Sequence, residues 1–239
     1  MAENHPVGFQ WVVEARERGA KVIHVDPRFT RTSAMADMWV PLRAGSDIAF
    51  LGGLIRYVIE NGKDFREYIL NYTNASVILR DDFRDTEDLG GVFSGWDEQK
   101  KEYKMDTWAY AGAAEKGSTG GSAGGGHAKD RGGEQIDEAT YEQDLTLQNP
   151  RCVYQLLKRH FSRYTPRMVE EVCGVPEKLF LEVAEAFCSA SGPDKTAAIC
   201  YAVGWTQHFP AGRLQRLRLL RGGVPVRRGG AQPGRRAGV

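Results

Sequence analysis

The chain has 239 residues, 41% of them hydrophobic, which is long enough for one or two domains with a sizeable core. Its net charge of +1 hides an uneven distribution: residues 209–239 contain eight arginines and no acidic residue, which leaves 24 basic and 31 acidic residues, a net charge of −7, on the rest. We expect no membrane-spanning segment, since no stretch of about 20 apolar residues occurs, and no signal peptide at the start MAENHPVGFQ. The wide spacing of the four cysteines argues against metal ligation by this chain alone.

The first predicted element is a helix over residues 5–18. Pro6 suits the first turn of a helix, and Gly19 ends the pattern. The apolar residues at helical spacing, which we expect to form one face, are Val7, Trp11, Val12 and Ala15.

A short apolar strand over residues 21–25 follows and ends on Asp26. We expect a parallel sheet buried on both faces, with ligands beyond the carboxyl ends of its strands. Asp26 lies there, where a carboxylate can accept hydrogen bonds from a ribose or from guanine N–H groups, and Arg28 adds a planar donor suited to phosphate. Taken alone, the Asp26-Pro27 turn is more often structural than a binding site, and His24 is more often a core histidine than a ligand.

A second strand is predicted over residues 38–42, followed by Gly45, Ser46 and Asp47. A helix then runs from Asp47 to about residue 61. Asp47 serves equally well as the N-cap of this helix and as a ligand-binding carboxylate, so both roles stay open.

The next segments are more varied. A helix capped by Asp64 should turn Phe65, Tyr68 and Ile69 inward. Residues 93–110 predict a hairpin with its turn at Ser94-Gly95. The glycine-rich residues 117–133 predict a flexible surface loop, within an insert over about 111–136, in which His127 is a solvated residue.

Three helices and a strand complete the predicted domain. The helices begin near residues 151, 166 and 177, and the strand covers residues 196–203. The alternation of strands and helices predicts an α/β fold, with a short, mostly parallel sheet flanked by helices over residues 1–208.

Three motifs in order, DPRFTRT at 26–32, GSD at 45–47 and GWTQH at 204–208, resemble the molybdopterin oxidoreductases. The runs NYTNAS and NPRCVYQLLKRH resemble the branch formed by the large subunits of selenocysteine-type formate dehydrogenases. The resemblance implies a bis-(molybdopterin guanine dinucleotide) cofactor with molybdenum or tungsten. The residues that it assigns to cofactor contacts are Asn4, His5, Asp26, Arg28, Gly45, Ser46, Asp47, Gly204, Trp205, Thr206, Gln207 and His208.

In that family the complete subunit oxidises formate to carbon dioxide and passes electrons to an iron–sulfur cluster. The resemblance implies an iron–sulfur beta subunit and a membrane cytochrome subunit as partners, a periplasmic location, and no nucleic acid. The family's cluster cysteines, metal ligand and catalytic histidine have no counterpart in this sequence, so we expect a fragment without catalytic or metal-binding residues, inactive alone and cytoplasmic if expressed as it stands. The alternative is a non-catalytic α/β nucleotide-binding module, although no G-x-G-x-x-G follows a strand.

The resemblance stops after His208. Residues 209–239 are rich in Arg, Gly and Pro and show no core pattern, so we expect a disordered tail. A shift of reading frame just after His208 explains this composition better than a basic arm for nucleic acid, because the tail lacks interleaved aromatic residues. Sequencing the gene again would test the frame.

Overall fold

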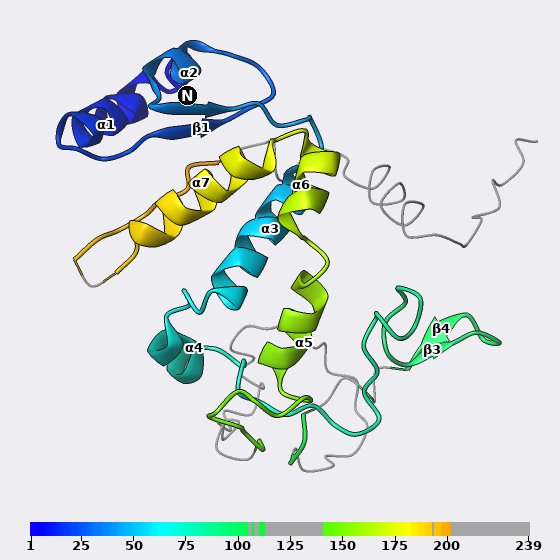
Figure 1. Cartoon of the computed structure of the whole chain (residues 1–239). Coiled ribbons are helices and arrows are strands. Elements are labelled where there is room, and N and C mark those ends of the chain that lie inside the picture. Colours follow the sequence, from blue (N-terminus) through cyan, green and yellow to red (C-terminus); the bar gives the residue numbers. More distant parts are fainter. Residues whose placement is uncertain (105–106, 108–109, 113–140, 193, 202–239) are drawn as a thin grey trace, which may run out of the picture. The chain divides into compact units, whose positions relative to one another are not determined.

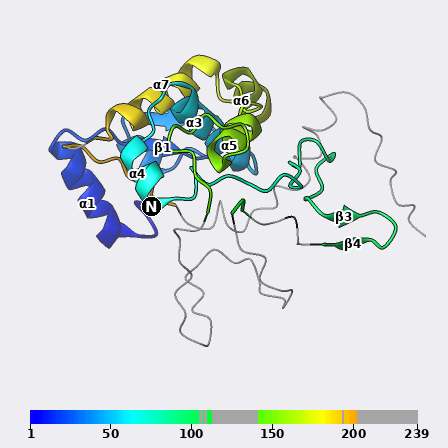
Figure 2. The same cartoon turned by 90° about the horizontal axis from the view of Figure 1, so that it is seen from below.

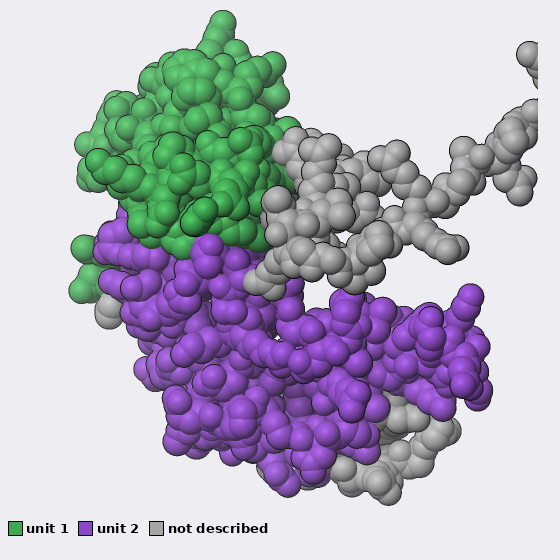
Figure 3. Space-filling view, turned by 45° about the vertical axis from the view of Figure 1, so that its right-hand side comes forward, with its two compact units in different colours: residues 1–51, 166–183, 192–239 green, residues 52–165, 184–191 purple. Residues whose placement is uncertain are grey.

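The computed structural model describes residues 1–104, 107, 110–112, 141–192 and 194–201. They belong to two compact units, drawn in green and purple in Figure 3. Unit 1 holds residues 1–51, 166–183 and the described residues from 192 onward, and unit 2 holds the described residues of 52–165 together with 184–191.

Unit 1 opens with a helix and a β–α–β segment, all drawn in blue in Figure 1. Helix α1 (Pro6–Glu17) precedes strand β1 (Ile23–Val25), and the short helix α2 (Arg31–Met35) leads to strand β2 (Met38–Val40). The two strands pair in parallel, as predicted, because the segment between them is just long enough to carry the chain back. Gly19, at a φ of 96°, makes the turn after α1.

The parallel sheet is only partly enclosed. All three residues of β1 are of intermediate exposure, whereas Val40 in β2 is fully buried. The prediction of a sheet buried on both faces is therefore wrong for β1. Two strands present less surface to cover than the larger sheets for which that rule holds.

The core of unit 1 draws on both ends of its sequence. Helix α3 (Asp47–Glu60) begins in this unit, and α6 (Pro166–Cys173) and the start of α7 (Glu177–Ser189) join it. The rings of Phe50 and Phe180 meet edge to face at 5.5 Å between centroids. Other buried apolar residues of the unit include Phe9, Val40, Leu42, Val169, Val175 and Val183.

Unit 2 has a small core of its own. It contains helices α4 (Arg66–Tyr72) and α5 (Val153–Phe161), and its buried cluster comprises Ala75, Leu147, Cys152 and Tyr154. On α4, the prediction of inward aromatic residues is wrong: Phe65 is 69% exposed and Tyr68 53%. The two rings stack on the surface, and Ile69 alone of the predicted three packs against the core cluster.

The predicted hairpin exists in unit 2 but turns elsewhere. Strands β3 (Trp96–Asp97) and β4 (Glu102–Tyr103) pair antiparallel and run side by side in Figure 2. The turn lies between them, at residues 98–101, and not at Ser94-Gly95. The Asp97 carboxylate holds it by accepting from the backbone N–H groups of Gln99 and Lys100, at 3.0 and 3.1 Å.

The predicted strand over residues 196–203 is wrong in its described part, because residues 196–201 form no strand. Ile199 and Tyr201 are 46% and 61% exposed, so this apolar run is not covered as a buried strand would be. The glycine-rich loop, His127 and the tail lie outside the described residues. In the described part of the chain, no helix is long and apolar enough to cross a membrane.

Candidate functional site

The carboxyl ends of β1 and β2 meet at one edge of the sheet in unit 1. The register pairs Val25 with Val40, and the Asp26 N–H donates to the Val40 carbonyl at 3.2 Å, which extends the ladder by one bond. Asp26–Arg28 follow β1 directly, and residues 45–47 follow β2 after residues 41–44, so both predicted site segments come after a strand that ends at this edge. This is where ligands of parallel α/β sheets bind.

Asp26 is held in place by hydrogen bonds to both its backbone carbonyl and its side chain. The indole N–H of Trp39 donates to the Asp26 carbonyl at 3.0 Å, and Oδ1 of Asp26 accepts from the Arg28 N–H at 2.8 Å. The second carboxylate oxygen, Oδ2, lies 3.8 Å from Nε2 of His24. Because the side chain is 38% exposed, this carboxylate is both oriented and open to a ligand.

Arg28 follows on the exposed side of the turn. Within the described residues its guanidinium has neither an ion pair nor a hydrogen bond. Five N–H donors are thus available two residues after an oriented carboxylate. Such a pair can bind a nucleoside through the carboxylate and a phosphate through the guanidinium.

His24 connects β1 to the first turn of α2. Its Nδ1 lies 2.9 Å from Oγ of Ser33, and Thr30 and Ser33 form a reciprocal capping box. Burial lowers the pKa of His24, and the amino-terminal ammonium lowers it further. The Asp26 carboxylate raises it, but by less than burial lowers it. The imidazole is therefore neutral at pH 7.

The second predicted segment is a tight loop in front of α3. Gly45 has a φ of 74° and is buried, a conformation that favours glycine. The hydroxyl of Ser46 donates to the Arg43 carbonyl at 2.5 Å, and Ser46 is 3% exposed. Ser46 is thus committed to the loop and not available to a ligand by its side chain.

Helix α6 fixes this loop from far along the sequence. The Arg43 N–H donates to the Cys173 carbonyl at 2.8 Å, and the Arg43 guanidinium donates to the Glu171 carbonyl at 2.6 Å. The thiol of Cys173 donates to the Ser46 carbonyl at 3.4 Å. These contacts join a loop and a helix end that are 127 to 128 residues apart in the sequence.

Of the two roles predicted for Asp47, that of N-cap of α3 is wrong. It is the first helical residue, and the Ser46 carbonyl before it accepts from the N–H groups of Ala49 and Phe50. The Asp47 carboxylate is of intermediate exposure and accepts no hydrogen bond from the described residues. At a helix N-terminus a carboxylate is also stabilised by the helix dipole.

Asn4 and His5 lie in the exposed turn before α1. The turn is tied to α2, because the N–H of Ala2 donates to Oγ1 of Thr32 at 3.0 Å. Ala2 thus contacts α2, while Asn4 and His5 follow it in the exposed turn. Asp26 and Arg28 come directly after β1, and residues 45–47 follow β2 along the chain. The remaining predicted contacts, Gly204, Trp205, Thr206, Gln207 and His208, lie outside the described residues.

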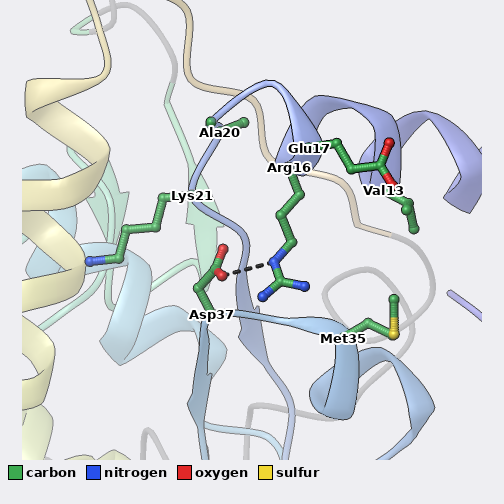
Figure 4. A pocket seen from close by; sticks show the side chains of 8 residues that line it. Val13, Arg16, Glu17, Ala20, Lys21, Met35 and Asp37 are labelled. Carbon is green, nitrogen blue, oxygen red and sulfur yellow. Dashed lines mark hydrogen bonds and ion pairs between the residues drawn. The ribbon is translucent and has the colours of Figure 1, made fainter.

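A cavity of about 520 Å³ lies at the opposite end of the sheet. Nε of Arg16 donates to the Asp37 carboxylate across it at 2.8 Å, while Lys21 points away from the guanidinium (Figure 4). The N–H of Val22 and Arg16 hold the pKa of Asp37 below its ordinary value. These contacts stabilise the start of both strands, and the cavity shares no lining residue with the predicted site.

The donor set at the carboxyl edge fits a nucleotide better than a metal ion. It combines an oriented carboxylate, a free guanidinium and a second carboxylate at a helix start. No group of three His, Cys, Asp or Glu residues that could hold a metal occurs in the described parts of the chain. The edge can therefore hold the nucleotide end of a larger cofactor.

Sequence reasoning missed Arg43 and Cys173 and left His24 as a core residue. Arg43 and Cys173 act through contacts with residues far away in sequence, so no local pattern identifies them. For His24 a signal was present, since a histidine inside an apolar strand two residues before Asp26 lies on the same side of that strand.

The chain is similar to several formate dehydrogenase subunits. The nitrate-inducible formate dehydrogenase major subunit of Escherichia coli is 47% identical over 209 residues, which cover 87% of this chain and 18% of that protein. The formate dehydrogenase subunit alpha of Megalodesulfovibrio gigas is 40% identical over 207 residues, 87% of this chain and 18% of its own. Formate dehydrogenase 2 subunit alpha (cytochrome c-553) of Nitratidesulfovibrio vulgaris is 42% identical over 233 residues, 96% of this chain and 20% of its own.

The chain thus spans about a fifth of the length of these relatives. No protein-family model matches it. A solved structure of acetylene hydratase from Pelobacter acetylenicus aligns with 82% of this chain and 16% of its own, at a TM-score of 0.43 and 19% identity, which is too distant to carry an argument.

Proposed function

The chain is homologous to one segment of the formate dehydrogenase major, or alpha, subunits, and we propose that this segment binds the guanosine end of a molybdopterin guanine dinucleotide. The observation that carries the proposal is the carboxyl edge of the sheet, where β1 ends at Asp26 and β2 leads on to the loop of residues 45–47. Both segments follow parallel strands, where the backbone turns away and leaves side chains free for a ligand.

Asp26 and Arg28 have complementary parts in this proposal. The Asp26 carboxylate accepts hydrogen bonds from guanine N–H groups or from the ribose diol, and its contact with the Arg28 N–H keeps it oriented. The Arg28 guanidinium neutralises the cofactor's phosphates. A bidentate guanidinium contact adds geometric selectivity to charge attraction.

The loop of residues 45–47 supplies shape and a second carboxylate. Gly45 allows the tight backbone turn, and the Ser46 side chain fixes the loop internally. Asp47 is the residue of this loop whose side chain is left to meet the ligand. Arg43 and Cys173 keep the loop rigid from α6, so that the cofactor meets a preformed surface.

In the complete subunit we propose that the cofactor carries molybdenum or tungsten and supplies the two-electron oxidation of formate to carbon dioxide. The residues of this chain bind and orient its nucleotide end. We further propose an iron–sulfur beta subunit and a membrane cytochrome subunit as partners of that assembly, in the periplasm, and Gly204–His208 as contacts to the cofactor's second half. Neither the metal ligand nor the cluster cysteines of that assembly belong to the proposed role of this chain.

Titration with guanosine diphosphate tests the proposal. We expect the wild-type chain to bind guanosine diphosphate more tightly than adenosine diphosphate in isothermal calorimetry. Asp26→Asn should lose about 1.5–3 kcal/mol of binding, as is usual for a hydrogen bond to a charged group. The matched control is Asp194→Asn, an exposed carboxylate of unit 1 that accepts no hydrogen bond from the described residues. Equal affinity in Asp26→Asn and in the control would contradict the proposal.

A further inference from the structure

We propose that His24 is a positioning residue of the nucleotide edge, which ties the Asp26 carboxylate to the first turn of α2 and so sets the direction from which Asp26 meets its ligand. The inference rests on the proposed function for the identity of the ligand. The link between His24 and Asp26 can be tested without any ligand.

The position of His24 in the strand brings it to Asp26. Residues two apart in a strand project from the same face, so the side chains of His24 and Asp26 lie next to one another. Trp39 is the partner of His24 across the sheet, and its indole N–H holds the Asp26 carbonyl at 3.0 Å. The His24 side chain is 17% exposed, too enclosed to be an independent surface group.

The hydrogen bonds around Ser33 select the tautomer of His24. Oγ of Ser33 accepts from the Thr30 N–H at 2.8 Å, so its own proton is available for Nδ1 of His24, 2.9 Å away. The proton of the neutral ring then sits on Nε2. Nε2 lies 3.8 Å from Oδ2 of Asp26, an electrostatic contact rather than a direct hydrogen bond.

The Asp26 carboxylate is thereby restrained at both oxygens. Oδ1 accepts from the Arg28 N–H at 2.8 Å, and Oδ2 faces the His24 N–H. With one restraint alone the carboxylate would still rotate about its last bond. A partner beside each oxygen favours one orientation of the carboxylate plane, which suits a ligand with two adjacent N–H donors.

The charges that act on His24 are the Asp26 carboxylate and the amino-terminal ammonium. Asp26 lies at the end of β1, the ammonium of Met1 donates to Oγ1 of Thr32 on α2 at 3.0 Å, and Arg31 on α2 pairs with Glu3 at 3.3 Å. Burial lowers the pKa of His24 against the pull of Asp26. The ring therefore takes up a second proton only at low pH, at Nδ1. The hydrogen bond between Nδ1 and Ser33 then reverses, with His24 as the donor.

Two substitutions separate positioning from packing. His24→Leu keeps the bulk and removes both ring nitrogens, and we expect it to weaken guanosine diphosphate binding about tenfold, as for loss of a contact to a charged group. His24→Gln retains an amide N–H directed at Asp26 and should lose less than about threefold. Wild-type affinity should fall as the pH is lowered below the ordinary pKa of histidine, and the His24→Gln profile should stay flat there. Unchanged affinity in His24→Leu, with only a lower unfolding temperature, would overturn the proposal.

Nitrogen-15 NMR of the histidine ring tests the link in the ligand-free chain. We expect the Nε2–H tautomer in the wild type and a lower His24 pKa in Asp26→Asn, because the carboxylate that stabilises the imidazolium is gone. Asp47→Asn, whose carboxylate does not touch His24, is the matched control. An unchanged His24 titration in Asp26→Asn would overturn the positioning role. Failure of the wild type to bind any guanine nucleotide, with the NMR result as expected, would instead refute the proposed function.

Discussion

Asp144 shows how one ionised side chain stabilises a strained turn in unit 2. Its Oδ1 accepts from the hydroxyl of Thr146 at 2.6 Å, and its Oδ2 accepts from the N–H of Asn149 at 2.6 Å. These bonds lower the pKa of Asp144 to about 2, the Thr146 hydroxyl contributing most. The turn holds Leu147 at a φ of 58° and fully buried in the core cluster.

Because of this turn, the stability of the chain depends on pH in the acidic range. The pKa of Asp144 is about 2 in the folded chain, below its ordinary value of 3.8, so its stabilisation is complete above pH 4 and is lost as the pH falls towards 2. We predict that urea unfolding of the wild type weakens more steeply between pH 4 and pH 2 than that of Asp144→Asn. Parallel profiles for the two proteins would contradict this.

Ser46 offers a test of the difference between a structural and a binding hydroxyl. It is 3% exposed and donates to the Arg43 carbonyl at 2.5 Å. We predict that Ser46→Ala lowers the free energy of unfolding by about 0.5–1.5 kcal/mol, the usual net value of a hydrogen bond. Affinity for guanosine diphosphate should change less than in Asp26→Asn. A larger loss of affinity than in Asp26→Asn would return Ser46 to the binding surface.

Single residues of the site differ in how well the sequence predicts them. Asp26 and Arg28 follow a short apolar strand, and that local pattern is enough to place them at the sheet edge. The commitment of Ser46 to its loop depends on Arg43, Cys173 and the end of α6, and no local pattern carries such distant contacts. Asp47 was ambiguous because a carboxylate suits both a helix start and a ligand.

Among the elements, helices with strong end signals were predicted best. Pro166 begins α6 and Gly174, at a φ of 73°, follows its last residue. The apolar run at residues 196–201 has the composition of a strand but no strand partner in the described residues, and composition alone cannot supply one. The prediction that the aromatic residues at α4 point inward was wrong for a related reason, because a short helix buries only part of its apolar surface.

A pair of glycines tests the packing of two helices. A Cβ on Gly52 in α3 would lie 2.7 Å from the ring of Tyr164, which is 6% exposed and has little room to move, whereas a Cβ on Gly8 in α1 would meet only Cε of Met1, at 3.5 Å. We predict that Gly52→Ala destabilises the chain by about 1–3 kcal/mol through overpacking. Gly8→Ala should be neutral or stabilising by up to about 1 kcal/mol, from better helix propensity. Thermal unfolding compares the two, and a Gly52→Ala protein as stable as Gly8→Ala would refute the close approach.

At the scale of the whole molecule, large apolar residues of α1 are exposed to solvent. Val7 and Trp11 on α1 are 74% and 65% exposed, although they have the spacing of a buried helix face. The prediction of an inward face there is wrong for these two residues. The chain spans about a fifth of the relatives that it matches.

We predict that the purified chain alone does not reduce a dye with formate. In the proposed role it contributes the nucleotide edge and not the metal ligand or the electron-transfer cluster. Formate-dependent dye reduction, measured anaerobically beside a complete formate dehydrogenase, checks this, and metal analysis of the same sample should give less than one molybdenum or tungsten per chain. Turnover comparable to that of the complete enzyme would contradict the prediction.

The central claim is that a guanine nucleotide binds at the carboxyl edge of the β1–β2 sheet. Amide chemical shifts, followed by NMR while guanosine diphosphate is added to the full chain, test it most directly. We predict that the amides of residues 26–28 and 45–47 shift together with one dissociation constant, while those of Arg16, Lys21 and Asp37 around the cavity at the opposite end stay in place. Shifts confined to that cavity, or none at the carboxyl edge at saturating nucleotide, would contradict the claim.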